Sequence, residues 1–232
     1  ASNPECEYGN PGGSTTIVLF GDSHAAQWFP ALEAAALRND WRLIVLAKMG
    51  CPAITVSVTM MDGGDYGGCD LWRYRSINRI VDVKPDLVIM ANYRSMRAKD
   101  GLGRERWRNA LLQTLSRIEK NKIPVLFFSD TPTAGKKFYG CLTQHTKNLT
   151  KCYRTRAEAT MPNYHPLTEE IMAKHGGMAY SPTDWFCTKV CPGVVGDISV
   201  YHDSDHITKT FSEFLSPFVE LLVKEALASL RV

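Results

Sequence analysis

The 232-residue sequence has no uninterrupted apolar run near the roughly 18 to 20 residues that a membrane-spanning helix needs. It also lacks long runs of one charge, since 27 basic and 24 acidic residues give a net charge of +3. Charge therefore gives no indication of a nucleic-acid partner. Internal repeats and low-complexity segments are missing too, and 44% hydrophobic with 22% charged residues is ordinary for a globular domain.

The chain has no initiator methionine and no signal peptide with a basic start and an apolar core. Its first residues, up to Gly13, are rich in proline and glycine. We expect residues 1–13 to be a linker and residues 14–232 to be a single domain, excised or processed from a longer protein.

The sequence contains seven cysteines. Since disulfides survive poorly in a reduced cytosol, they indicate an oxidising compartment. Cys187 and Cys191 could form half of a metal site, but no second cysteine or histidine pair has zinc-like spacing beside them. We therefore predict disulfides and no bound metal.

Strand-like and helical patterns alternate along the chain. The strand-like runs cover residues 15–20, 41–47, 85–91, 123–128 and 178–180, and the helical patterns cover 31–37, 71–83, 105–120, 167–174 and 214–226. This alternation predicts an α/β fold with a mostly parallel sheet and helices on both faces. Residues 131–164 break the alternation, so we predict an insertion packed on the core.

The turn Gly21-Asp22-Ser23 joins the first predicted strand to the first predicted helix. In a parallel sheet this turn lies at the carboxyl edge of the strands, where ligands bind, and the helix start offers N–H groups to a developing negative charge. Ser23 is therefore well placed to be a nucleophile.

A base for this serine lies near the other end of the chain. Asp203 precedes His206 by three residues, just before the last predicted helix. Serine needs a base to take its proton, and the base needs an acceptor that fixes its tautomer. His206 is therefore a candidate base and Asp203 a candidate orienting residue, and the family resemblance described below selects this pair. Asp205 is an alternative to Asp203 as the orienting residue, or it caps the last helix. His202 is a weaker alternative to His206 as the base. We expect His24 to pack against the site or to support it.

The two blocks Gly21-Asp22-Ser23 and Asp203-x-x-His206 resemble the first and last motifs of the SGNH (GDSL-type) hydrolase superfamily. The longer strings GDSHAAQ and DSDHIT resemble a narrower group, the SGNH domain fused behind the membrane-embedded acyltransferase-3 (AT3) domain of bacterial surface O-acetyltransferases. This resemblance implies a three-layer α/β/α sandwich with a disulfide-bearing insertion. It also implies a periplasmic domain of an inner-membrane protein.

The resemblance further implies an oxyanion hole, whose donors stabilise the charge that develops on a carbonyl oxygen. The matching positions are the N–H of Ser23, Gly50 after the second strand and the side chain of Asn92 after the third. The family's third block, Gly-x-Asn-Asp, is replaced here by Ala91-Asn92-Tyr93-Arg94, so Arg94 is a further candidate donor.

Together with proximity in the sequence, the resemblance indicates three disulfides. The pairs are Cys51 with Cys69, Cys141 with Cys152, and Cys187 with Cys191. Cys6 is left free or paired outside this sequence. Tyr66, Tyr93 and Trp185, on predicted loops, are the expected carbohydrate contacts.

The leading hypothesis is an O-acetyltransferase that carries an acetyl group, through an acyl-enzyme, to a hydroxyl of a bacterial surface polysaccharide, with lipopolysaccharide O-antigen as the expected acceptor. The resemblance implies no bound cofactor, an upstream membrane domain as partner and acetyl-CoA as the ultimate acyl source. An esterase with the same triad is the first alternative, because triad residues do not decide between water and a sugar as acceptor. A glycan-docking module without catalysis is the second, favoured by the unusual third block.

Overall fold

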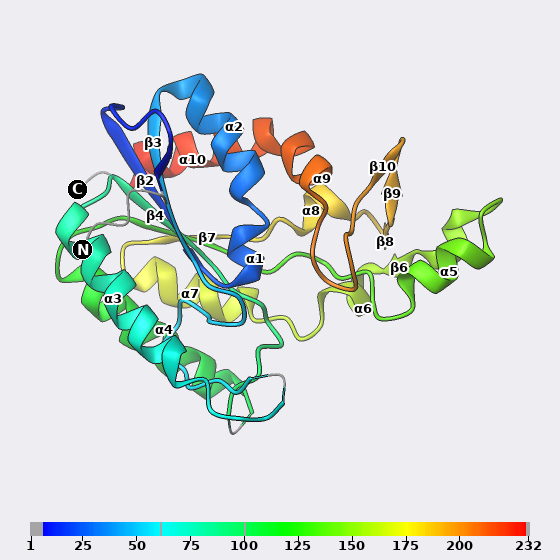
Figure 1. The fold of residues 1–232 in the computed structure, drawn as a ribbon, viewed down its shortest axis with the longest axis horizontal. Helices are drawn as coiled ribbons and strands as arrows, with labels where there is room; N and C mark the ends of the chain where they lie inside the picture. The colour runs from blue at the N-terminus through cyan, green and yellow to red at the C-terminus, as the bar shows by residue number, and fades with distance from the viewer. Residues whose placement is uncertain (1–6, 61, 100, 231–232) are drawn as a thin grey trace.

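The computed structural model describes residues 7–60, 62–99 and 101–230. Its centre is a six-stranded sheet with the order β1-β3-β2-β4-β5-β7 (Figure 1). Neighbouring strands are parallel except for β1, which runs antiparallel to β3. The strands are β1 (Glu7–Gly9), β2 (Thr15–Gly21), β3 (Trp41–Ala47), β4 (Leu87–Ala91), β5 (Val125–Phe128) and β7 (Met178–Tyr180).

Side chains of the central strands alternate between two apolar layers. Along β2, Ile17 and Leu19 pack on one face, and Val18 and Phe20 pack on the other. Helices α2, α9 and α10 cover the first face and α3, α4 and α7 cover the second, above and below the sheet in Figure 1. Because both faces are covered, the central strands are mostly apolar. The predicted three-layer α/β/α sandwich is confirmed.

The bounds of the helices agree with the predicted patterns to within a few residues in most cases. They are α1 (Ser23–Ala26), α2 (Phe29–Asn39), α3 (Gly67–Val83), α4 (Arg104–Glu119), α7 (His165–Lys174), α9 (Lys209–Phe214) and α10 (Ser216–Ser229). The single last helix that we predicted is divided at Leu215. Pro217 lies in the first turn of α10, where its missing N–H costs no helical hydrogen bond.

The linker prediction for residues 1–13 was wrong for part of this range. Glu7–Gly9 forms β1, an edge strand on β3, and its Glu7 carboxylate accepts two hydrogen bonds from Arg42 at 3.0 and 2.7 Å. The proline and glycine content of this segment concealed a short strand whose pairing depends on a distant part of the chain. Residues 1–6 lie outside the described residues.

The insertion of residues 131–164 extends from the carboxyl edge of the sheet, at the right of Figure 1. It contains α5 (Phe138–Gln144), the 3-10 helix η2 (Leu149–Cys152), β6 (Arg154–Thr155) and α6 (Arg156–Thr160). Strand β6 pairs with β8 (Val190–Cys191), which follows α8 (Thr183–Phe186). A hairpin of β9 (Val194–Val195) and β10 (Ile198–Ser199) comes next.

All three predicted disulfides are present: Cys51–Cys69, Cys141–Cys152 and Cys187–Cys191. The first joins the loop after β3 to α3, the second ties α5 to η2, and the third closes the loop after α8. Cys6 lies outside the described residues. None of the helices within residues 7–60, 62–99 and 101–230 combines the length and the apolarity needed to cross a membrane.

Candidate active site

Ser23 lies at the start of α1, directly after the central strand β2. Gly21 allows this turn, because a Cβ at its position would overlap the carbonyl oxygen of Ala91 in the neighbouring strand. The buried Asp22 caps α1 by accepting a hydrogen bond from His24 N at 2.9 Å, and its other oxygen accepts one from Tyr93 N at 2.9 Å. The turn that carries Ser23 is therefore fixed to the carboxyl ends of both β2 and β4.

His206 approaches from a loop of the last fifth of the chain. Tyr201 and Ile207 form an antiparallel bridge, and the N–H of His202 donates to the carbonyl of His206 at 2.8 Å. The N–H of Ile207 also donates to Oε1 of Gln27 at 3.0 Å. Gln27 ends the GDSHAAQ string, so this string both carries Ser23 and holds the loop of His206.

The structure brings together the three residues predicted as nucleophile, base and orienting residue. His206 Nε2 lies 2.8 Å from Ser23 Oγ, and His206 Nδ1 lies 2.7 Å from Asp203 Oδ2. The other carboxylate oxygen of Asp203 accepts hydrogen bonds from the backbone N–H groups of Asp205 and His206 at 2.9 and 2.7 Å. The serine hydroxyl, imidazole and carboxylate thus form a continuous hydrogen-bonded chain.

Asp205 also faces the imidazole, with Oδ1 3.2 Å from His206 Nδ1. Its Oδ2 accepts hydrogen bonds from Tyr93 Oη at 3.2 Å and from Ser204 Oγ at 3.1 Å. The hydrogen bond with Asp205, together with that from Asp203, raises the pKa of His206 to about 9. The capping role that we considered for Asp205 belongs instead to Thr208, whose hydroxyl accepts from Phe211 N.

Behind Ser23 lies a buried charged network that centres on Asp130. Asp130 Oδ1 is 2.7 Å from His24 Nδ1, and its Oδ2 accepts from both the backbone N–H and Nε of Arg94 at 2.9 and 3.0 Å. Burial opposes ionisation, but His24 and Arg94 hold the pKa of Asp130 well below its ordinary value. His24 stacks on Tyr93 at 4.4 Å and lies 4.6 Å from the His206 ring, so it supports the site as predicted.

Sequence reasoning missed Asp130. A signal was available, since Asp130 stands two residues after the predicted strand 123–128 and therefore at the same carboxyl edge as Ser23. Asp130 stands directly before the predicted insertion of residues 131–164, and no motif marks it.

The predicted oxyanion donors occupy different environments. Asn92 is buried; its Oδ1 accepts from Ala53 N at 2.6 Å, and its Nδ2 has no hydrogen-bond partner in the described chain. Gly50 is exposed at the carboxyl end of β3 with a φ of 66°. Arg94 is held by Asp130 and by the carbonyl of Ala159 at 3.3 Å, and its buried Nη2 also has no hydrogen-bond partner in the described chain. Each of the two side-chain candidates thus has one buried donor nitrogen without a partner, and Arg94 differs from Asn92 in being bound to the Asp130 carboxylate.

The three predicted aromatic sugar contacts lie in different surroundings. Trp185 lies in α8 and packs on Trp28 and Phe128, with ring centroids 6.0 and 6.4 Å away. Tyr93 is bound to Asp205 and stacked on His24, as described above. Tyr66 donates to the carbonyl of Met49 at 3.2 Å. Of the three, Tyr93 is the one whose contacts place it beside His206, and the role of all three as sugar contacts stays a prediction.

Within the described chain, one group of three residues could bring metal-ligating atoms together, namely His24, Asp205 and His206. Their ring nitrogens already face other partners: Nδ1 of His24 faces Asp130, and the two nitrogens of His206 face Asp203 and Ser23. The absence of a metal requirement stays a prediction.

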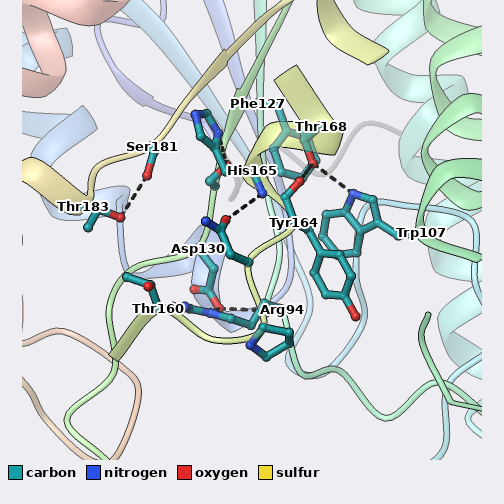
Figure 2. A pocket seen from close by; sticks show the side chains of 13 residues that line it. Arg94, Trp107, Phe127, Asp130, Thr160, Tyr164, His165, Thr168, Ser181 and Thr183 are labelled. Atoms are coloured by element: carbon teal, nitrogen blue, oxygen red, sulfur yellow. Dashed lines mark hydrogen bonds and ion pairs between the residues drawn. The ribbon is translucent and has the colours of Figure 1, made fainter. Parts of the chain in front are cut away.

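A small cavity adjoins the buried network (Figure 2). Its lining includes Arg94, Asp130 and His165, whose Nδ1 lies 2.8 Å from Ser129 Oγ. Burial lowers the pKa of His165. At about 30 Å³ the cavity has room for roughly one or two water molecules and not for a sugar ring. Ser23 and His206 do not line it, so it is not the acceptor site.

The fold is shared with solved structures of low sequence identity. The periplasmic domain of a lipopolysaccharide acetyltransferase from Salmonella ser. Paratyphi A is 20% identical, with a TM-score of 0.72 over 94% of this chain and 85% of that chain. A putative acylhydrolase from Bacteroides fragilis is 11% identical, with a TM-score of 0.57 over 94% and 90%. A mutant acetyl-xylooligosaccharide esterase from Geobacillus Stearmophilus is 12% identical, with a TM-score of 0.54 over 94% and 96%.

No curated protein sequence matches the chain significantly. A family model does match, the SGNH domain fused to AT3 domains, and the match extends over residues 1–220. This range contains both motif blocks and all three disulfides, in agreement with the resemblance seen in the sequence. The chain therefore belongs to the family of SGNH domains that are fused to AT3 domains.

Proposed function

We propose that this domain is an O-acetyltransferase that uses Ser23 to carry an acetyl group to a hydroxyl of a bacterial surface polysaccharide. The observation that carries the proposal is the chain of contacts from Ser23 Oγ to His206 Nε2 at 2.8 Å and from His206 Nδ1 to Asp203 at 2.7 Å. This is the arrangement that acyl transfer through a serine requires.

In the first step, neutral His206 accepts the proton of the Ser23 hydroxyl while Oγ attacks the carbonyl carbon of an acyl donor. The resulting imidazolium then donates this proton to the leaving group, and acetyl-Ser23 remains. Asp203 keeps Nδ1 protonated and holds the ring in place, as its 2.7 Å hydrogen bond allows. The proposed steps use protein groups alone, without a metal or a resident cofactor.

In the second step, a sugar hydroxyl attacks the acetyl-serine. His206 accepts the proton of this hydroxyl and returns it to Ser23 Oγ as the ester is released. The fusion of related domains to AT3 domains supports a membrane acyltransferase domain as the partner that delivers the acyl group, with acetyl-CoA as the ultimate source. We accordingly place the domain in the periplasm, with lipopolysaccharide O-antigen as the first acceptor to test.

For the oxyanion hole we propose the N–H groups of Ser23 and Gly50 and the side chain of Asn92. The support is the buried Asn92 Nδ2, which lacks a partner in the described chain. A buried amide donor without a partner costs stability, and an oxyanion would satisfy it during turnover.

A second candidate, an esterase, is favoured by one observation. The side chains of His206 and Asp203 are 26% and 44% exposed, so solvent reaches the proposed base. Water could then replace the sugar as the acceptor.

Intact mass spectrometry tests the proposal directly. The oxidised protein is exposed to an activated acetyl ester, with Ser23→Ala as the matched control and an O-antigen fragment in a parallel sample. We expect one acetyl adduct that depends on Ser23 and is discharged faster by the glycan than by water. Discharge at the same rate with and without glycan would indicate an esterase. An adduct that persists in Ser23→Ala would refute the assignment of the nucleophile.

A further inference from the structure

The positive charge of this chain is concentrated in the insertion. Residues 131–164 contain six basic residues and one acidic residue, a net charge of +5, whereas the whole chain carries +3. The basic residues are Lys136, Lys137, Lys147, Lys151, Arg154 and Arg156. The balanced total therefore conceals one strongly basic segment.

The four lysines of this segment are exposed to solvent. They lie on and beside α5 and η2, which the disulfide Cys141–Cys152 ties together at the end of the projecting insertion (Figure 1). No ion pair involves these lysines within the described residues. By contrast, Arg156 pairs with Asp184 at 2.6 Å, and Arg154 is bonded to Thr133. The lysine charges are therefore not used in holding the insertion together.

The base of this segment is bonded to the loop that carries His206. The N–H of Gly135 donates to the carbonyl of Ser204 at 2.9 Å. The hydroxyl of Tyr139 donates to the carbonyls of His202 and Tyr201 at 2.6 and 2.9 Å. The basic surface is thus continuous with the rim of the candidate active site.

Tyr139 adds an aromatic ring to this surface. Its hydroxyl is fixed by the two carbonyls, its ring contacts Phe138 at 5.3 Å, and 48% of the residue remains exposed. A fixed, exposed ring loses little conformational entropy on binding and offers a flat face to a sugar.

We propose that Tyr139 and the lysines Lys136, Lys137, Lys147 and Lys151 form the acceptor-binding surface, and that the acceptor is an anionic polysaccharide bearing carboxylate or phosphate groups. This inference rests on the proposed function and specifies its substrate class. A polymer with one hydroxyl at Ser23 extends outward across Tyr139 and the lysines, which attract its charges. Because the lysines are exposed, the attraction weakens as salt increases.

The test measures binding of fluorescent oligogalacturonate, which carries a carboxylate on each sugar, and of a neutral maltooligosaccharide of equal length. We call the lysine-bearing part of the insertion, residues 136–151, the arm, and the arm variant replaces Lys136, Lys147 and Lys151 with glutamine. We expect it to bind oligogalacturonate roughly tenfold more weakly than the wild type, since each exposed ion pair contributes modestly. Binding should also weaken with salt in the wild type. Tyr139→Ala should weaken binding of both oligosaccharides.

The matched control replaces Lys84, Lys120 and Lys122 with glutamine. These exposed lysines precede β4 and β5 and therefore lie at the opposite edge of the sheet. The control loses the same charge and should bind oligogalacturonate like the wild type. Equal losses in the two variants, or equal binding of the charged and neutral oligosaccharides, would overturn the proposal. Binding of anionic phospholipid vesicles that depends on the arm, without binding of oligogalacturonate, would overturn it too.

The acetyl adduct on Ser23 is measured on the wild type in parallel, so that the two proposals can fail separately. An adduct without arm-dependent binding refutes the acceptor surface alone. Arm-dependent binding without an adduct leaves the surface supported and refutes the acyl-enzyme.

Discussion

The pH dependence of the proposed reaction depends on two carboxylates that face one imidazole. His206 must be neutral to accept the proton of Ser23, and its pKa is raised to about 9 by Asp205 and Asp203. At pH 7 roughly one molecule in a hundred then has a neutral His206. We therefore expect kcat/KM to rise about tenfold per pH unit until it levels off near the pKa of His206.

Asp205→Asn removes one of these charges. Asp205 Oδ1 lies 3.2 Å from His206 Nδ1, and two unit charges at this distance attract by about 1.3 kcal/mol even in bulk water, which is about one pKa unit. The variant should move the rising limb of the profile down by about one pH unit or more. At pH 7 its kcat/KM should increase about tenfold, while the plateau at high pH stays near that of the wild type.

Asp203→Asn is the comparison. Asp203 forms the shorter contact, 2.7 Å, and the amide would no longer hold the correct tautomer, so its plateau should fall by about 10²- to 10⁴-fold. Both profiles can be measured by hydrolysis of an activated acetyl ester. Asp205→Asn could instead lower the plateau of kcat/KM as Asp203→Asn does and leave the pH of the rising part of the profile unchanged. Asp205 would then be the orienting residue, and our assignment would be wrong.

Three further predictions concern the support of the site and its oxyanion hole. Asp130→Asn should lower the free energy of unfolding by about 3–5 kcal/mol, because two buried cationic partners lose their counter-ion; a loss in chemical denaturation no larger than that of the exposed Asp82→Asn would contradict this. Asn92→Ala should lower kcat about 10²- to 10³-fold with little change in KM, and an unchanged kcat in a folded variant would remove Asn92 from the oxyanion hole. Replacement of Cys51 and Cys69 by serine opens a link with a sequence separation of 18 and should cost about 3 kcal/mol of unfolding free energy. Chemical denaturation of the oxidised wild type and of this double variant checks that loss, and equal stability of the two proteins would show that the link adds nothing.

Local signals in the sequence were sufficient for the architecture. The mostly apolar run of residues 41–47 coincides with β3, because a strand covered on both faces is rich in apolar side chains. The strand β1 escaped prediction, since three residues carry no periodicity and their pairing with β3 is long-range. The division between α9 and α10 was missed because the apolar pattern continues through Leu215.

Site residues were predictable where two restrictions act on the same residue. One is the residue type that the chemistry needs, and the other is a position at which the α/β fold binds ligands. Ser23 follows the central strand, and His206 and Asp203 stand in a motif with fixed spacing. The predicted loop position of Trp185 was wrong, because this residue lies in α8 and packs on Trp28 and Phe128. Tyr139 was overlooked because only the fold brings its hydroxyl to the loop of His206.

By itself the sequence determined the alternation of strands and helices and the candidate nucleophile, because these follow from periodicity and a short motif. The sandwich, the three disulfide pairs and the choice of His206 and Asp203 needed the family resemblance as well. The tertiary structure decided what depends on distances across the chain. It placed two carboxylates instead of one against His206 and buried Asp130 between His24 and Arg94. It also joined a basic insertion to the rim of the site. Spacing along a chain does not report such distances, since they are set by how the sheet, helices and loops pack.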